Sequence, residues 1–157
     1  MSGRTRRVML RRLHVARSRF AADEDAVLAE SVMNAQTAVD PLTLDERVVY
    51  DADEYLGSIM MDGHILTFSN KGLERIDDFV KALDRVGATR ENALLGQALL
   101  LWEKHGYVAF DEADDALRSA FDVLDEQFFA AASAEDSLEL RTKHYVREHI
   151  DAFVILD

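Results

Sequence analysis

The chain has 157 residues, of which 18 are basic and 30 are acidic, so its formal net charge is −12. Apolar residues make up 48% of the chain and charged residues 31%, a composition that indicates a globular domain and excludes a disordered one. The absence of cysteine excludes a disulfide framework, a thiol nucleophile and a thiolate metal site.

The charges are divided unevenly along the chain. The first twenty residues contain seven arginines and no acidic residue, so residues 21–157 hold 11 basic side chains (18 minus 7) and all 30 acidic ones. A body with a formal charge of −19 is a poor partner for nucleic acid and a good partner for basic surfaces. We predict two parts, a basic N-terminal arm over 1–20 and one acidic helical domain over 21–157.

No segment indicates a membrane or a secretory destination. The longest apolar stretch, Ala93 to Trp102, is too short to span a bilayer. The basic N-terminus is not followed by the apolar region of a signal peptide. We therefore expect a cytoplasmic protein without a membrane partner.

The apolar residues recur at helical spacing, and the chain has one proline and seven glycines, fewer turn residues than a strand-rich fold needs. We predict an all-α fold, a single compact bundle of about six helices. Thr43 is the predicted N-cap of the second helix, with Glu46 completing a capping box. The segment between Gly63 and Gly72 is predicted to be irregular. The expected helices span 23–38, 43–61, 73–86, 89–105, 111–131 and 135–154, with Thr89 and Ser133 as further caps and Gly87 after the third.

The helix expected over 111–131 has an acidic face. At 100° per residue its apolar side chains share one side, and four carboxylates lie nearly opposite: Asp111, Asp115, Asp122 and Glu126. A solvated helix face is the more common reason for such a row, and a binding surface is the alternative. Phe129 falls on the acidic side, which favours a contact surface. Asp77, Asp78 and Asp84 form a second candidate acidic patch.

Catalytic and metal-binding motifs are missing from the chain. It has no nucleotide-binding glycine loop, no His-Glu-x-x-His and no Gly-x-Ser-x-Gly. His144 and Glu148 are four residues apart, a spacing more typical of an ordinary polar pair on a helix than of two metal ligands. We predict that the protein is not an enzyme and has no metal or cofactor.

The segment from Gly63 to Arg75, followed by Gly87-Ala88, resembles the signature of a bacterial family known for a DNA-mimic protein. Members carry Asn-Gly-Gly, then Phe or His, then x-Gln-aromatic-Phe-x-Asn, and later Ile-Gly-Ala. The resemblance covers about residues 40–105. The matching positions here are Gly63, His64, Phe68, Asn70, Gly72 and Gly87 with Ala88.

The departures from this signature affect its polar positions. Ser58 stands where the family has glutamate, Met61-Asp62 replaces Asn-Gly, and Leu66 replaces glutamine. We therefore interpret the retained residues as structural. The two glycines would supply unusual backbone angles, Asn70 would cap the following helix, and Phe68 would anchor the core.

The resemblance implies an acidic all-α protein, a homodimer, whose carboxylates imitate DNA phosphates on the DNA-binding face of a regulator. The leading hypothesis is thus a binding protein that docks on a basic, DNA-binding partner and blocks it, without contacting nucleic acid itself. One alternative is an immunity or antitoxin-like protein that neutralises a basic toxin. Another is a small enzyme or ligand-binding protein with a pocket lined by Tyr55, His64 and Asn70.

Overall fold

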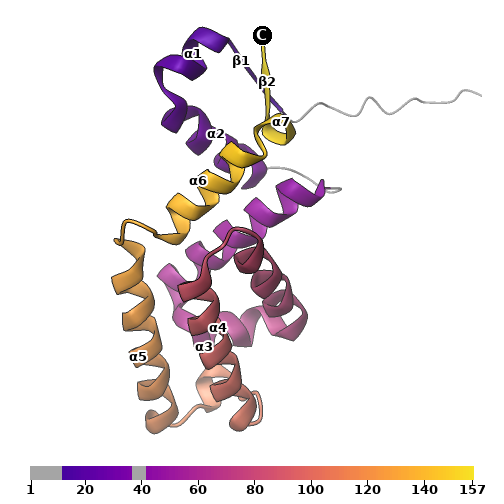
Figure 1. Ribbon diagram of the computed structural model, residues 1–157. Coiled ribbons are helices and arrows are strands. Elements are labelled where there is room, and N and C mark those ends of the chain that lie inside the picture. The colour runs from indigo at the N-terminus through magenta and orange to yellow at the C-terminus, as the bar shows by residue number, and fades with distance from the viewer. Residues whose placement is uncertain (1–11, 37–41) are drawn as a thin grey trace, which may run out of the picture.

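The computed structural model describes residues 12–36 and 42–157, and its elements are helices except for two short strands (Figure 1). The elements, in chain order, are β1 (Leu13–Val15), α1 (Arg17–Ala22), α2 (Glu24–Gln36), α3 (Leu44–Arg85), α4 (Thr89–Lys104), the 3-10 helix η1 (Phe110–Glu112), α5 (Asp115–Ala132), α6 (Leu138–Glu148), α7 (Ile150–Phe153) and β2 (Val154–Leu156). The prediction of an all-α fold is confirmed, with seven α-helices in the described ranges.

Helix α3 begins at the predicted capping box, in which the Thr43 hydroxyl accepts a hydrogen bond from the Glu46 N–H. Two glycines with positive φ, Gly63 (71°) and Gly72 (79°), divide it into three helical stretches. The prediction of an irregular segment over 63–72 is wrong, because the residues between the glycines form a helix. Glycine adopts positive φ without steric cost, so the chain changes direction twice and resumes the helix at once.

Several predicted helix ends differ from the structure because another residue provides the cap. Helix α5 begins at Asp115, with Asp114 accepting a hydrogen bond from the Leu117 N–H, and Asp111 lies outside it in η1. Helix α6 is capped by Ser137 and not by Ser133, and it ends at Glu148. The residue before α4 is Ala88, so Thr89 is its first helical residue and not its cap.

The two ends of the described chain lie together (Figure 1). Strand β1 pairs in parallel with β2, and Leu13 faces Val154 in the register. Residues 1–11 of the predicted arm lie outside the described residues, but residues 13–15 form β1 and residues 17–20 belong to α1. Val15 is buried in the core, which explains why this part of the arm joins the folded body.

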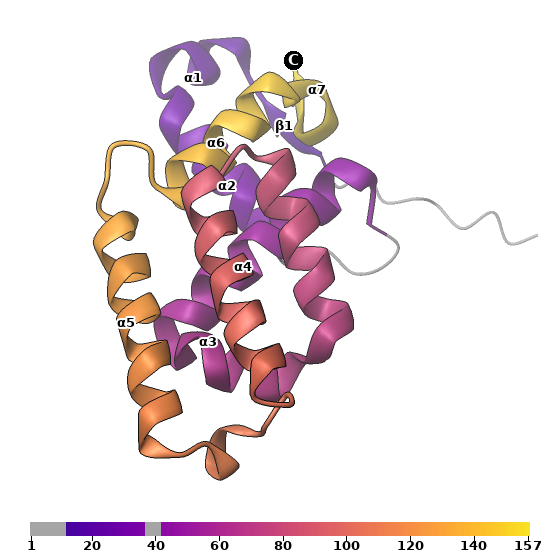
Figure 2. The same cartoon turned by 60° about the horizontal axis from the view of Figure 1, so that its bottom comes forward.

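Helices α3, α4 and α5 pack on one another, and α2 and α6 cross the end of this group where α3 begins (Figures 1 and 2). Helix α4 contacts both α3 and α5. Within the described ranges, no helix has the length and apolar character that a membrane crossing requires. The largest buried side chains of the core are aromatic: Tyr55, Phe68, Phe79, Phe121 and Phe128.

Candidate functional site

A buried hydrogen-bond network joins α3 to α5 around His64, whose exposed fraction is 0%. The Asp125 Oδ1 atom accepts a hydrogen bond from the His64 backbone N–H (3.0 Å) and lies 2.6 Å from His64 Nδ1. A carboxylate can only accept, so Nδ1 carries the proton. The His64 Nε2 atom then accepts from the Tyr55 hydroxyl at 2.9 Å. Every polar atom of the imidazole is satisfied inside the protein.

Gly63 is required by this network for two reasons. Its φ of 71° is in the left-handed region, and a Cβ atom there would lie only 3.1 Å from the Asp125 Cγ and closer still to one carboxylate oxygen. A side chain at this position would push the Asp125 carboxylate away from the His64 backbone N–H. The glycine therefore allows α5 to approach the turn in α3.

Aromatic rings enclose the network. The His64 ring makes edge contacts with Phe68 and Phe128, each with ring centroids 5.9 Å apart. Burial raises the pKa of Tyr55 well above its usual value, and the negative charges of Glu91 and Asp125 raise it further. The packing makes this network a structural contact between two helices.

The remaining signature residues are spread over the structure. Phe68 lies in the core against Trp102 and Phe121. Asn70 is exposed, and its side chain makes no hydrogen bond with a described residue, so it does not cap the stretch after Gly72. Gly87 follows α3 with a φ of 71°, as a glycine after a helix commonly does.

Asp125 is the partner of His64 that the sequence did not predict, whereas Tyr55, expected beside His64, contacts it through a hydrogen bond inside the core. At 100° per residue Asp125 lies between the acidic and the apolar side of α5, and its side chain is 14% exposed. This intermediate position is the one signal in the sequence that separates Asp125 from the other carboxylates of the helix.

The exposed face of α5 carries three of the four predicted carboxylates. Asp115, Asp122 and Glu126 are exposed and make no ion pair with a described residue. We call these three residues the outer row. Asp111 is also exposed, but it belongs to η1, so the predicted row of four on one helix is reduced to three.

The second predicted patch is largely neutralised by neighbouring cations. Asp77 pairs with Lys81 at 2.6 Å, and Asp78 pairs with Arg75 at 3.1 Å. Asp84 is exposed and without an ion pair to a described residue. This patch therefore presents less free negative charge than the outer row.

Arg75 also connects the first and third stretches of α3. Its guanidinium pairs with Asp51 at 2.6 Å and with Glu54, and it lies 4.9 Å from the centroid of the Phe79 ring. Burial raises the pKa of Asp51 although Arg75 acts in the opposite direction. Part of the acidity of the chain thus serves its internal packing.

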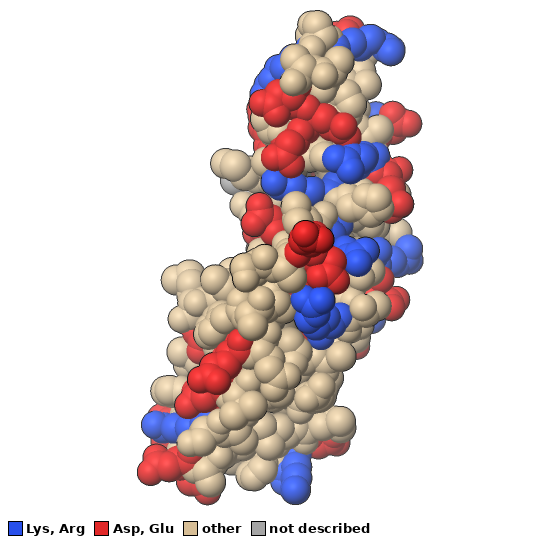
Figure 3. All heavy atoms as spheres, turned by 60° about the vertical axis from the view of Figure 1, so that its left-hand side comes forward, with Lys and Arg blue, Asp and Glu red and all other residues tan. Residues whose placement is uncertain are grey.

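Figure 3 shows how the charges are distributed on one face. Acidic and basic groups are mixed over its upper half, whereas its lower half is largely uncharged, with a short acidic row along the left edge. Ion pairs neutralise part of the surface charge of the described residues, for example Arg147 with Glu24 and Lys143 with Asp25. The acidic residues do not form one continuous surface on this face.

The comparisons with known proteins give one family. No curated protein and no solved structure matches the chain. The sequence model of the family described as DMP19-like protein matches residues 40–149, a range that contains α3, α4, α5 and α6. The protein therefore belongs to the DMP19-like family.

Proposed function

We propose that the protein is an acidic binding protein that docks on a basic, DNA-binding partner and blocks the surface that would hold DNA. The observation that carries this proposal is the outer row, three exposed carboxylates on α5 that no described cation neutralises. Membership of the DMP19-like family supports it, together with the resemblance of residues 63–75 to the signature of the DNA-mimic family.

The spacing of the outer row limits how closely its charge density can match that of DNA. Asp115 and Glu126 are separated by about 16 Å along the helix axis, at 1.5 Å per residue. Duplex DNA carries about one charge per 1.7 Å, so the same length of DNA holds roughly three times as many charges. The outer row can replace a few phosphates in a basic groove, and it releases fewer counterions than DNA does.

The surroundings of His64 argue against a role of the 63–72 segment in catalysis or ligand binding. His64 is completely buried, its ring is enclosed by aromatic side chains, and its nitrogens are used by Tyr55 and Asp125. A substrate would have to displace core side chains to reach it. The arrangement supports a protein that acts through its surface and not as an enzyme.

The test uses the variant Asp115→Asn/Asp122→Asn/Glu126→Gln. Immobilised wild-type protein is first used to retain partners from a lysate of the source organism at low salt, with stepwise salt elution and mass spectrometry. We expect DNA-binding proteins that added duplex DNA displaces. The purified partner should then bind the variant more weakly and with a flatter dependence on salt.

A matched control removes the same charge elsewhere. Glu74→Gln/Glu103→Gln/Asp151→Asn changes three exposed carboxylates that have no ion pair with a described residue. Equal affinity of the two triple variants would contradict the proposal. A single partner that DNA does not displace would instead favour an immunity or antitoxin-like protein.

A further inference from the structure

An open, mostly apolar groove runs along α4 where it packs beside the third stretch of α3. Figures 1 and 2 show these two helical segments side by side, joined by a short turn. Val80 of α3 forms one wall of the groove. The residues of α4 that line it are Thr89, Asn92, Ala93, Gly96, Leu99 and Leu100. At 100° per residue these six positions cover about one third of the circumference of α4, so they share one face of the helix. We call this surface the α4 groove.

The α4 groove has a protruding leucine beside a position without a side chain. Leu100 is 67% exposed, and Gly96 lies one turn before it. A Cβ atom added at Gly96 would have nothing within 4 Å, so the packing of the described residues does not require a glycine there. Glycine inside a helix is destabilising relative to alanine, and it permits the close approach of another backbone. The glycine and the exposed leucine therefore fit a second helix that packs into the groove.

We propose that the α4 groove is the contact between two copies of this chain, whose α4 helices pack antiparallel and meet at Gly96. Leu100 of each copy then lies against Ala93 of the other, where the small side chain leaves room for it, and Leu99 lies against Asn92. The same residues meet on both sides of a twofold axis, so the contact closes as a dimer. This inference does not depend on the proposed function, because the outer row lies on α5 and outside the groove.

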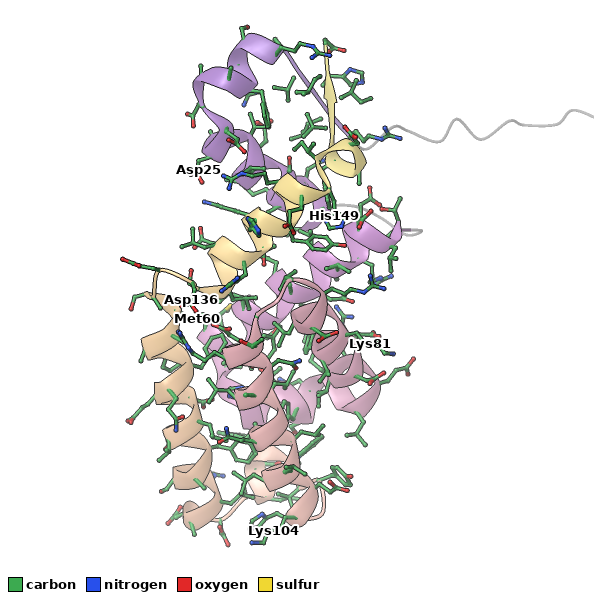
Figure 4. The ribbon with its side chains drawn as sticks, viewed as in Figure 1. Asp25, Met60, Lys81, Lys104, Asp136 and His149 are labelled. Carbon is green, nitrogen blue, oxygen red and sulfur yellow. The ribbon has the colours of Figure 1, made fainter. Side chains whose placement is uncertain are left out.

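The distribution of charge supports a second copy as the occupant. Two molecules of net charge −12 repel each other where acidic surfaces meet, and none of the described residues that line the α4 groove is charged. Glu103 is exposed on the same side of α4 as Gly96. In the antiparallel arrangement Glu103 faces Thr89 of the second copy, in the first turn of α4, where the helix dipole favours a carboxylate. Figure 4 shows Lys104 at the lower end of α4, so the neighbouring Glu103 marks one end of the interface.

Sedimentation equilibrium of the full-length protein tests the dimer. We expect the wild type to form a dimer in a concentration-dependent way. Leu100→Glu should raise the dissociation constant at least tenfold, because each dimer then buries two charges without a partner. The matched control is Leu140→Glu, the same change at an exposed leucine of α6 that does not line the groove. It should dimerise like the wild type.

Cysteine cross-linking tests the antiparallel register, and the chain has no native cysteine that would interfere. Gly96→Cys places both thiols at the point where the helices meet, so oxidation should join two copies. Ala93→Cys alone should not cross-link, because its two thiols are then about 9 Å apart along the helix axes, beyond the reach of a disulfide. A mixture of Ala93→Cys with Leu100→Cys should form a mixed disulfide. Gly57→Cys, at another glycine with free space around it, is the control for random collision.

A protein that stays monomeric at every concentration, or a dimer that both glutamate variants weaken equally, would overturn the inference. Equal cross-linking of Gly96→Cys, Ala93→Cys and Gly57→Cys would also overturn it. A different protein that the wild type retains from a lysate and Leu100→Glu does not would assign the groove to that protein instead. The variant Asp115→Asn/Asp122→Asn/Glu126→Gln should dimerise like the wild type, so the proposed function can fail without affecting this result.

Discussion

Neighbouring carboxylates on α5 have opposite surroundings. Asp125 points toward α3, where its oxygen serves both the backbone N–H and the ring of His64. Asp122 and Glu126, within one turn of it, are exposed and without ion pairs to described residues. Successive residues of a helix are rotated by about 100°, so Asp125 faces α3 while Glu126 faces the solvent. An acidic helix can therefore hold a structural carboxylate and a free charged face at once.

The contact between Asp125 and His64 and the outer row should therefore respond differently to substitution. Changes at the contact between Asp125 and His64 should alter the free energy of unfolding, whereas changes in the outer row should leave it nearly unchanged and alter partner binding.

The largest effect is expected for Gly63→Ala. The new methyl group meets the Asp125 carboxylate, and alanine is strained at a φ of 71°. Strain of about 1–3 kcal/mol and a disturbed charged hydrogen bond of similar size give a loss of about 3–5 kcal/mol in the free energy of unfolding. Urea denaturation measures it.

The matched control is Gly57→Ala, in the first stretch of the same helix. Nothing lies within 4 Å of an added Cβ at this position. Alanine is preferred over glycine inside a helix, so we expect a gain of about 0.5–1 kcal/mol. Similar destabilisation of both variants would show that the approach of Asp125 does not explain the glycine at position 63.

Asp125→Asn should have the next largest effect. The amide lacks the charge that strengthens both hydrogen bonds from His64, and we expect a loss of about 2–3 kcal/mol. Thermal unfolding should show a midpoint lower by several degrees. Asp122→Asn, three residues away, should stay within about 0.5 kcal/mol of the wild type. Equal midpoints for these two variants would contradict the distinction between the inner and the outer carboxylates.

Tyr55→Phe should cost about 1–2 kcal/mol at pH 7, because His64 Nε2 loses its donor in a buried place. The effect should depend on pH. The pKa of Tyr55 is raised well above its usual value of 10.0 in the folded protein, so above about pH 10 the unfolded chain releases a proton that the folded one keeps. The contribution of Tyr55 to stability therefore falls as pH rises through this range, by up to about 1.4 kcal/mol per pH unit.

The phenylalanine variant lacks this titration, so the stability difference between it and the wild type should shrink from about pH 10 upward. Urea denaturation between pH 8 and 11 measures the difference. A constant difference over this range would argue against a buried, neutral Tyr55 hydroxyl.

The smallest effect on stability is expected for Asp115→Asn/Asp122→Asn/Glu126→Gln. Asp122 and Glu126 are like charges four residues apart, so their removal relieves a weak repulsion. The loss of the Asp115 charge from the first turn of α5, where it is favourable, offsets this relief. We therefore expect the free energy of unfolding to stay within about 0.5 kcal/mol of the wild type. A loss of more than about 1 kcal/mol would mean that the outer row has a structural role and would complicate its use as a binding variant.

The helical class, the capping box at Thr43 and the exposed acidic face of α5 are local features, and the sequence predicts them. Helix periodicity and capping depend on residues a few positions apart. The same local rules misplaced the segment after Gly63, because a glycine at a helix turn and a glycine in a loop have the same sequence signal.

The sequence by itself therefore determined the helical class, the capping box at Thr43 and three of the carboxylates that face outward on α5. Only the tertiary structure decided that Asp125 binds His64, 61 residues away, that Arg75 neutralises Asp51 and Asp78, and that β1 pairs with β2. These contacts depend on how whole helices pack, and the interactions within single helices do not specify them.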